Sequence, residues 1–203
     1  MRKLVTITFV TLDGIMQAPG GPEEDDSGGF KSGGWSVNYW DDLMGQVMGE
    51  NFAKNPDLLL GRKTYDIFAA YWPLHRDEPG AANLNGAKKY VCSRTYDKEE
   101  VAWENSTLIN GDVVQEITRL KAMDGPEIQV HGSGNLIQTL LKHNLIDELR
   151  LWIFPVSIGN GKRFFGEGTN PSGFKLLDSK TSSSGVILAT FGYSGDLKTG
   201  TFA

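Results

Sequence analysis

A run of apolar residues that ends in glycine, two cations and a hydroxyl is the feature that most constrains this fold. It lies in segment 58–66, LLLGRKTYD, where Gly61, Arg62, Lys63 and Thr64 follow the expected strand. Such a junction suits a phosphate, because the helix dipole and outward N–H groups favour an anion and the cations neutralise its charge. The segment therefore predicts a buried strand, a helix start and an anion-binding turn between them.

Two later segments repeat this pattern. Segment 88–95, KKYVCSRT, predicts a strand that reaches Cys92, Ser93 and Arg94, and segment 128–136, IQVHGSGNL, predicts a strand that reaches a Gly-x-Gly turn before another helix. The residues of this third junction are His131, Gly132, Ser133, Gly134, Asn135 and Leu136. Three such strand ends in one α/β chain indicate a nucleotide cofactor.

Each junction also has a plainer interpretation. A single Gly-x-Gly is equally typical of a tight strand-to-helix turn, and Ile137 stands where the dinucleotide fingerprint requires its third glycine, which argues against a Rossmann fold. Arg62 and Arg94 could be solvated surface cations. Cys92 is more typical of a small buried strand residue than of a nucleophile, because no base is near it in sequence.

Length and charge exclude several classes of protein. A chain of 203 residues with 39% hydrophobic residues can bury one sizeable core, so we expect one domain over 1–203. A net charge of -5 without a basic stripe argues against a nucleic-acid binder. One cysteine and three histidines without ligand spacing predict neither a disulfide framework nor a metal site. With no signal-peptide or membrane-spanning pattern, we expect a cytoplasmic protein without a membrane partner.

Alternating strand and helix patterns predict a mixed, mostly parallel sheet with helices on both faces and a closing antiparallel hairpin. The expected strands are 5–11, 57–60, 89–92, 127–130, 148–154, 174–180 and 186–193. The expected helices are one capped by Ser36 or Asn38 that runs to 53, then 62–69, a helix that starts at 111–112, and 134–143. The glycine-rich segment 13–35 is a long loop, typical of an active-site cover or a disordered insertion. Segment 73–87 is a polar turn region, and segment 101–109 shows no clear pattern.

The order of these motifs closely resembles the dihydrofolate reductase fold, which implies three α/β/α layers. Within that fold the chain is similar to the family that contains the reductase domain of the bacterial riboflavin-biosynthesis deaminase-reductase. The narrower match rests on 11–16, TLDGIM, and 147–165, DELRLWIFPVSIGNGKRFF, and the resemblance covers about 3–191. The zinc motifs of that family's deaminase half are missing, so we expect a stand-alone reductase-like unit whose substrate need not be the riboflavin precursor.

The resemblance implies NADPH as the cofactor. It implies that Gly61, Arg62, Lys63 and Thr64 wrap its pyrophosphate and adenosine side, with Cys92, Ser93 and Arg94 beside the ribose 2′-phosphate. The third junction, His131 to Leu136, would hold the pyrophosphate at a helix N-terminus. A 2′-phosphate suits a guanidinium and a hydroxyl, which favours NADPH over NADH.

The catalytic and substrate-binding residues are less constrained. Asp13 follows the first strand, where the resemblance implies the mouth of the nicotinamide and substrate pocket, although an Asp-Gly turn explains it nearly as well. Asp41 and Asp42 are rivals, because dihydrofolate reductases carry their substrate carboxylate on the equivalent helix; favourable charge at a helix start is the alternative. Four aromatic residues could form a wall for a flat heterocycle: Trp35, Tyr39, Tyr65 and Phe164. Core packing explains Tyr65 and Phe164 equally well, and an exposed turn explains the charges of 159–163.

The sequence thus predicts an NADPH-dependent reductase that transfers a hydride to a small heterocyclic substrate resembling a pterin or a pyrimidine. The alternative is a non-catalytic NADP(H)-binding module of the same fold. Apolar residues of the late strands, among them Trp152 and Phe154, favour a homodimer.

Overall fold

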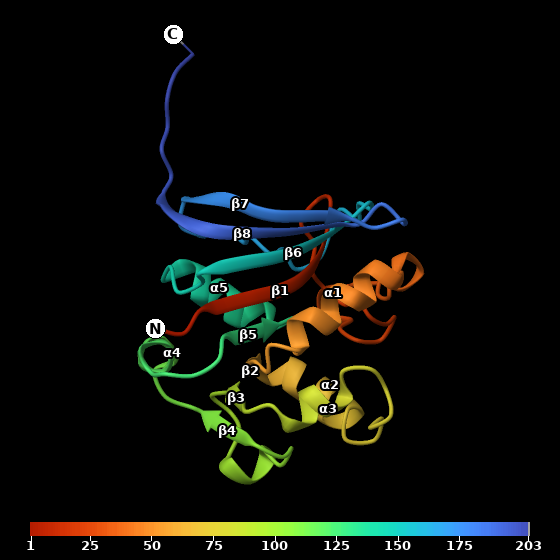
Figure 1. The fold of residues 1–203 in the computed structure, drawn as a ribbon, viewed down its shortest axis with the longest axis vertical. Helices are drawn as coiled ribbons and strands as arrows, with labels where there is room; N and C mark the ends of the chain where they lie inside the picture. Colours follow the sequence, from red (N-terminus) through yellow and green to blue (C-terminus); the bar gives the residue numbers. More distant parts are fainter. Residues whose placement is uncertain (203) are drawn as a thin grey trace.

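An eight-stranded sheet forms the centre of the computed structural model, which describes residues 1–202 (Figure 1). The strands are β1 (Leu4–Thr11), β2 (Asp57–Gly61), β3 (Lys89–Cys92), β4 (Ser106–Ile109), β5 (Ile128–His131), β6 (Glu148–Phe154), β7 (Ser172–Thr181) and β8 (Ile187–Asp196). Their order is β4-β3-β2-β5-β1-β6-β8-β7. Strands β1 to β6 pair in parallel, whereas β8 is antiparallel to both neighbours. The predicted mixed sheet with a closing hairpin is confirmed.

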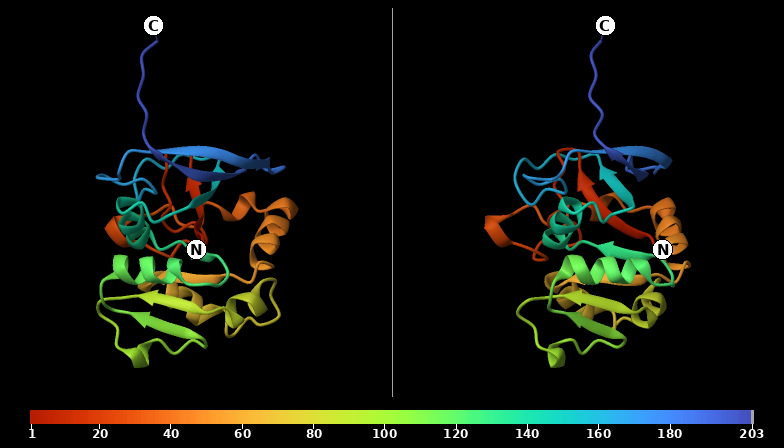
Figure 2. Two further views of the ribbon diagram at one scale, coloured as in Figure 1. Left: turned by 60° about the vertical axis from the view of Figure 1, so that its left-hand side comes forward. Right: turned by 90° about the vertical axis from the view of Figure 1, so that its left-hand side faces the viewer.

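Helices cover both faces of this sheet (Figure 2). They are α1 (Asp42–Phe52), α2 (Arg62–Tyr71), α3 (Ala81–Gly86), α4 (Val113–Ala122) and α5 (Gly134–Lys142). Side chains alternate along each strand, so Ile128 and Val130 of β5 pack in one core with α4 and α5, whereas His131 packs against α1 and α2. The apolar faces of α1, α2 and α3 meet the opposite side of the sheet in a second core. The arrangement has three layers.

The first helix begins later than the sequence suggested, and its predicted caps are wrong. Residues Val37–Tyr39 form a short 3-10 helix, and neither Ser36 nor Asn38 caps α1. Asp41 does so instead: its backbone is extended and its Oδ1 accepts the Met44 N–H at 3.1 Å. The 3-10 turn and the extended Trp40 therefore separate the loop from the helix.

Two short elements were not predicted. Helix α3 lies within the expected turn region 73–87, and an edge strand, β4, lies within the undefined segment 101–109 and pairs in parallel with β3. The other strands and helices that the sequence predicts are present, and their bounds differ from the predicted ones by a few residues. In residues 1–202, no helix combines the length and apolarity needed to cross a bilayer.

Loop 13–35 is packed onto the body of the protein. Gln17 is buried at its centre: its Nε2 donates to the carbonyls of Asp25 and Ser27, and its Oε1 accepts the Lys162 N–H. Phe30 is buried with Ile15 in a small apolar cluster. The loop is therefore not a disordered insertion, and its role as an active-site cover stays a prediction.

Candidate functional site

The three phosphate-type junctions meet at one edge of the sheet. Strands β3, β2 and β5 are neighbours and run in parallel, so their carboxyl ends share that edge. The first and third junctions are also hydrogen-bonded to each other. Gly61 N–H donates to Ser133 Oγ at 2.9 Å, and Ser133 N–H donates to Thr64 Oγ1 at 2.9 Å. The β2–α2 and β5–α5 turns therefore form a single unit.

The N-terminus of α5 has no side-chain cap. Ser133 is its N-cap residue, but the Ser133 hydroxyl donates to the His131 carbonyl at 2.8 Å and accepts the Gly61 N–H, so it is turned away from the helix. Gly132 and Ser133 both have left-handed backbones, with φ of 51° and 57°. The amides of the first helical turn, at Gly134, Asn135 and Leu136, have no partner within the helix. This end of α5 suits an anion.

Close approach and a left-handed backbone explain why glycine stands at position 132. A Cβ at Gly132 would lie 3.1 Å from Thr64 Oγ1, tighter than most such contacts. A Cβ at Gly134 would lie 3.5 Å from Met16 Sδ, so the long loop reaches the third junction. Leu136 is buried in the core, whereas Asn135 is exposed.

The second junction forms a hydroxyl-capped turn. Ser93 Oγ accepts the N–H groups of Thr95 and Tyr96 at 3.2 and 3.1 Å, and Arg94 is exposed beside it. Burial raises the pKa of the Cys92 thiol to about 12, so this group is a thiol at neutral pH. Arg62 lies 3.5 Å from Asp66 and its guanidinium lies over the Tyr96 ring, which joins the first junction to the second.

His131 contributes its backbone and not its side chain to this edge. The imidazole is buried beside the rings of Phe52 and Phe68, with Nε2 3.1 Å from Gln129 Oε1. Burial, together with the nearby charge of Arg150, lowers its pKa to about 4. The ring is therefore neutral and lies beneath α1 and α2.

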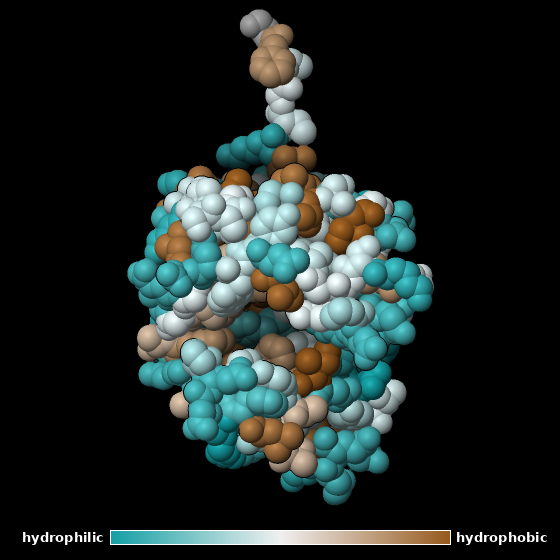
Figure 3. Space-filling model, turned by 90° about the vertical axis from the view of Figure 1, so that its right-hand side faces the viewer, coloured by the Kyte–Doolittle hydropathy of each residue, from teal (hydrophilic) through white to brown (hydrophobic). Residues whose placement is uncertain are grey.

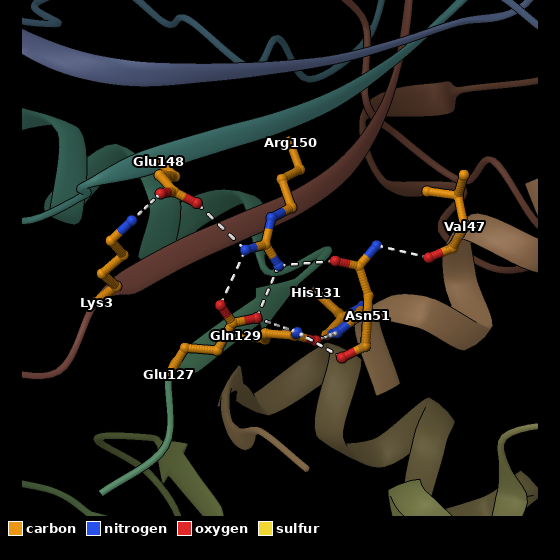
Figure 4. A network of polar contacts seen from close by, with 8 residues as sticks. All are labelled: Lys3, Val47, Asn51, Glu127, Gln129, His131, Glu148 and Arg150. Carbon is orange, nitrogen blue, oxygen red and sulfur yellow. Dashed lines mark hydrogen bonds and ion pairs between the residues drawn. The ribbon is translucent and has the colours of Figure 1, made fainter. Parts of the chain in front are cut away.

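A buried polar network adjoins His131 (Figure 4). The Arg150 guanidinium binds both oxygens of Glu127, at 2.7 and 2.9 Å, and Glu148 at 3.2 Å. It also donates to Asn51 Oδ1 at 2.8 Å, which fastens the last turn of α1 to the sheet. Sequence analysis missed this network, because nothing in the spacing of Asn51, Glu127 and Arg150 shows that they meet.

Asp13 holds a neighbouring loop. Its carboxylate accepts the Thr11 hydroxyl at 2.5 Å, the Gly159 N–H at 2.7 Å and the Ile158 N–H. The hydrogen bonds from Thr11 and Gly159 lower its pKa to about 2. The group is thus an ionised acceptor near neutral pH, and its role as a catalytic acid remains a prediction without support from this geometry.

The rival carboxylates lie at the start of α1. Asp41 caps the helix, and its Oδ2 accepts the N–H and hydroxyl of Ser183, in the β7–β8 turn, both at 2.8 Å. Asp42, in the first helical turn, is exposed, and within residues 1–202 its carboxylate has no hydrogen bond or ion pair. Of the two, Asp42 is the one available to a ligand.

The four aromatic candidates do not form one wall. Trp35 and Tyr39 both meet Phe154 edge to face, at centroid distances of 5.2 and 6.0 Å. Tyr65 belongs to the core beneath α2, where its hydroxyl accepts the Trp103 N–H at 2.9 Å. Phe164 is buried in the core on the other face. Trp40 packs on Phe9 and Trp152 and is 49% exposed; sequence analysis did not propose it, because it has no periodic partner.

A hollow crosses the side of the molecule that faces right in Figure 1, between an upper and a lower part (Figure 3). Helix α1 extends to the same side. The hollow and the helix that carries Asp42 thus lie on the same side of the molecule.

Comparisons with known proteins agree with this architecture. The family model described as RibD C-terminal domain matches residues 2–188. The chain is 30% identical over 199 residues to the uncharacterized protein YyaP of Bacillus subtilis (strain 168), and this alignment covers 96% of each chain. A solved structure from Shewanella sp. PV-4, titled as a riboflavin biosynthesis protein, aligns with a TM-score of 0.70 at 23% identity, over 96% of this chain and 99% of that one. Dihydrofolate reductase from Enterococcus faecalis, complexed with NADP(H), aligns with a TM-score of 0.60 at 13% identity, over 94% and 96%.

Proposed function

The chain belongs to the RibD C-terminal domain family and has a dihydrofolate reductase-like, reductase-type fold, and from this premise we propose that it is an NADPH-dependent reductase of a small heterocyclic substrate. One observation carries the proposal. The uncapped N-terminus of α5, with its left-handed turn at Gly132 and Ser133, is hydrogen-bonded to the β2–α2 junction and has cations close by.

The residues at this edge fit the dinucleotide. The free amides of the first α5 turn bind the pyrophosphate, and the α2 start supplies Arg62 and Lys63 as counter-charges. The exposed Arg94 guanidinium binds the ribose 2′-phosphate beside the Ser93 turn. When bound, NADPH supplies a hydride from its nicotinamide ring. The side chains of Cys92, His131 and Leu136 are packed inward, so these three support the edge through their backbone positions.

The substrate, a pterin- or pyrimidine-like ring, binds on the α1 side. Trp35 and Tyr39, which both pack against Phe154, line the substrate position. Asp42 provides a carboxylate that can pair with ring nitrogens. Asp13 holds the 158–159 loop in position, because its oxygens are already occupied by two N–H groups and a hydroxyl. Tyr65 and Phe164 act as core residues.

The alternative function is an NADP(H)-binding module without turnover. The separation of the four aromatic candidates favours it, because it leaves the substrate side less enclosed. Oxidation of NADPH in the presence of a panel of pterins and pyrimidines separates the two functions, since the module would bind the cofactor without consuming it.

We also propose that the protein is a homodimer. Strand β7 is an edge strand on which Leu176 and Leu177 are about half exposed, and such edges tend to pair with a second chain. A mass of one chain by sedimentation at micromolar concentration would contradict this.

The cofactor assignment is tested by titrating NADPH and NADH against the wild type, Arg94→Glu and the control Lys175→Glu, which changes an exposed cation on β7. We expect tighter binding of NADPH by the wild type. Arg94→Glu should weaken NADPH binding by roughly tenfold or more, because a charge-assisted pair is replaced by repulsion, and should not change the affinity for NADH. The control Lys175→Glu should bind both dinucleotides as the wild type does. Equal affinities for both dinucleotides in all three proteins would refute the assignment.

A further inference from the structure

The Asp25 carboxylate lies between two lysines that come from opposite sides of the proposed cofactor edge. Its Oδ1 lies 3.3 Å from Lys63 Nζ, at the start of α2, and its Oδ2 accepts a hydrogen bond from Lys162 Nζ, in the glycine-rich 159–168 loop. Asp25 itself belongs to the 13–35 loop. One carboxylate therefore binds two ammonium groups from distant parts of the chain.

Asp25 is the most buried member of this triad. Its side chain is 17% exposed, against 58% for Lys63 and 39% for Lys162. Ser27 donates to the same carboxylate through its N–H and its hydroxyl, at 3.2 and 2.5 Å. Partial burial opposes ionisation, but the hydrogen bonds from Lys162 and Ser27 outweigh it and lower the pKa of Asp25 below its usual value. The group is a fixed anion.

The segment that carries Lys162 is linked to the third junction. Met16 N–H donates to the Lys162 carbonyl at 2.8 Å, and Met16 Sδ lies beside Gly134, at the start of α5. On the other side, Thr64, next to Lys63, accepts the Ser133 N–H. The backbone segments that carry Lys63 and Lys162 are thus both joined to the start of α5, through Thr64 and Met16.

The Asp25–Lys63 contact is also a bridge between the loop and the edge. Among residues 1–202, it is the only hydrogen bond or ion pair that joins loop 13–35 to the β2–α2 junction. Gln17, at the centre of the loop, makes its polar contacts elsewhere. It bonds to residues within the loop, among them Trp35, and to the Lys162 N–H. Breaking this ionic contact therefore removes the only polar link between the loop and the β2–α2 junction among residues 1–202.

We propose that Lys63 and Lys162 form one anion subsite, that Asp25 fills it in this structure, and that a phosphate group of the dinucleotide displaces Asp25 as it binds. A phosphate carries more charge than a carboxylate and has oxygens for both ammonium groups, and lysine is a common phosphate ligand. The 13–35 loop then acts as a cover whose own carboxylate competes with the cofactor. This inference rests on the proposed function for the identity of the ligand.

The test compares Asp25→Asn with Asp26→Asn, a matched control whose side chain is exposed and makes no capping bond. Asparagine keeps an acceptor for Ser27 and removes the charge. Binding of NADPH and of inorganic pyrophosphate is measured by calorimetry. Asp25→Asn should bind both about fivefold more tightly, because two partly exposed ion pairs no longer compete. In a Lys162→Gln background the gain should shrink, and Lys162→Gln alone should weaken binding.

A second measurement needs no nucleotide. Lys31 is an exposed trypsin site in the same loop, so cleavage after Lys31, followed by mass spectrometry, reports how firmly the loop is held. Asp25→Asn should accelerate this cleavage several-fold, and Asp26→Asn should not.

The outcomes separate the two proposals. If the wild type binds pyrophosphate and Asp25→Asn tightens that binding, but NADPH does not bind, the proposed function fails and the anion subsite stands. If Asp25→Asn weakens or does not change the binding of pyrophosphate, Asp25 is a structural residue and the inference is overturned. Unchanged cleavage at Lys31 would overturn the role of the contact in holding the loop.

Discussion

Replacing Arg150 by methionine tests whether the buried network beneath α1 is held together by this one cation. The guanidinium, 8% exposed, is shared by Glu127, Glu148 and Asn51. Without it, Glu148 keeps the Lys3 ammonium, but Glu127 keeps only the Gln129 amide, at 2.6 Å. Removal of one partner of a buried pair costs about 3–5 kcal/mol, and the remaining contact of Glu148 argues for the lower end, about 3 kcal/mol.

The loss should also depend on pH in a specific direction. In the wild type, burial raises the pKa of Glu127 but the bonds from Arg150 and Gln129 outweigh it, so the folded pKa lies below the usual value. Its contribution to stability is present at neutral pH and is lost as the pH falls through that folded pKa. In Arg150→Met the burial is unopposed, the folded pKa of Glu127 rises above the unfolded value, and lowering the pH stabilises the protein. The difference between the two proteins should therefore narrow from pH 7 to pH 5.

Urea denaturation at both pH values, followed by tryptophan fluorescence and far-ultraviolet circular dichroism, measures this difference. The control is Arg119→Met, which breaks an exposed pair with Glu116 on α4 and should cost no more than about 0.5 kcal/mol. A cost for Arg150→Met below about 1 kcal/mol, or one that is the same at pH 7 and pH 5, would refute the reasoning.

Three further predictions concern single groups. Because the folded pKa of His131 is about 4 and the unfolded value is about 6.5, the wild type should lose about 3 kcal/mol as the pH falls from 6.5 to 4, and urea titrations of His131→Gln should lack this loss. Lys89, fully buried, donates to the carbonyls of residues 85, 87 and 104, so Lys89→Met should cost about 3 kcal/mol in thermal and urea unfolding, whereas the exposed neighbour Lys88→Met should cost almost nothing. Asp13→Asn should weaken NADPH binding by loosening the 158–159 loop, and the acid limb of a pH–rate profile should not move, because the pKa of Asp13 is about 2; a shifted limb would contradict this.

The sequence could predict the edge of the sheet because local patterns determine it. Each junction is a strand followed by a helix, and parallel strands bring their carboxyl ends to the same edge whatever their order. Thus the sequence predicts that the residues from Gly61 to Thr64 and from Gly132 to Leu136 meet at one edge of the sheet, and the strand order places them there. The hydrogen bonds between Gly61, Ser133 and Thr64 were not predictable, because they depend on β2 and β5 being neighbours.

Side-chain direction was harder to predict than backbone position. His131 ends β5 as expected, but strand alternation turns its ring beneath α1 and α2, away from the junction. The Tyr65 side chain also points into the core, because it lies on the buried side of α2. A sequence motif therefore predicts where the backbone of a candidate site residue lies. The elements that pack against that residue decide where its side chain points.

The acidic run of the long loop also shows that neighbouring elements decide the direction of a side chain. Residues 23–26 read as four similar carboxylates, yet they differ in the structure: Glu24 accepts the Gly20 N–H within the loop, Asp25 meets two lysines, and Glu23 and Asp26 are exposed. The difference arises because Gln17 binds the carbonyls on both sides of Asp26, which fixes the loop so that only Asp25 points at Lys162. A substitution at Gln17 should therefore release Asp25 without changing any charge, and Gln17→Ala should accelerate tryptic cleavage at Lys31 as Asp25→Asn does. If Gln17→Ala left that cleavage slow, the loop would be held by its apolar cluster around Phe30 instead.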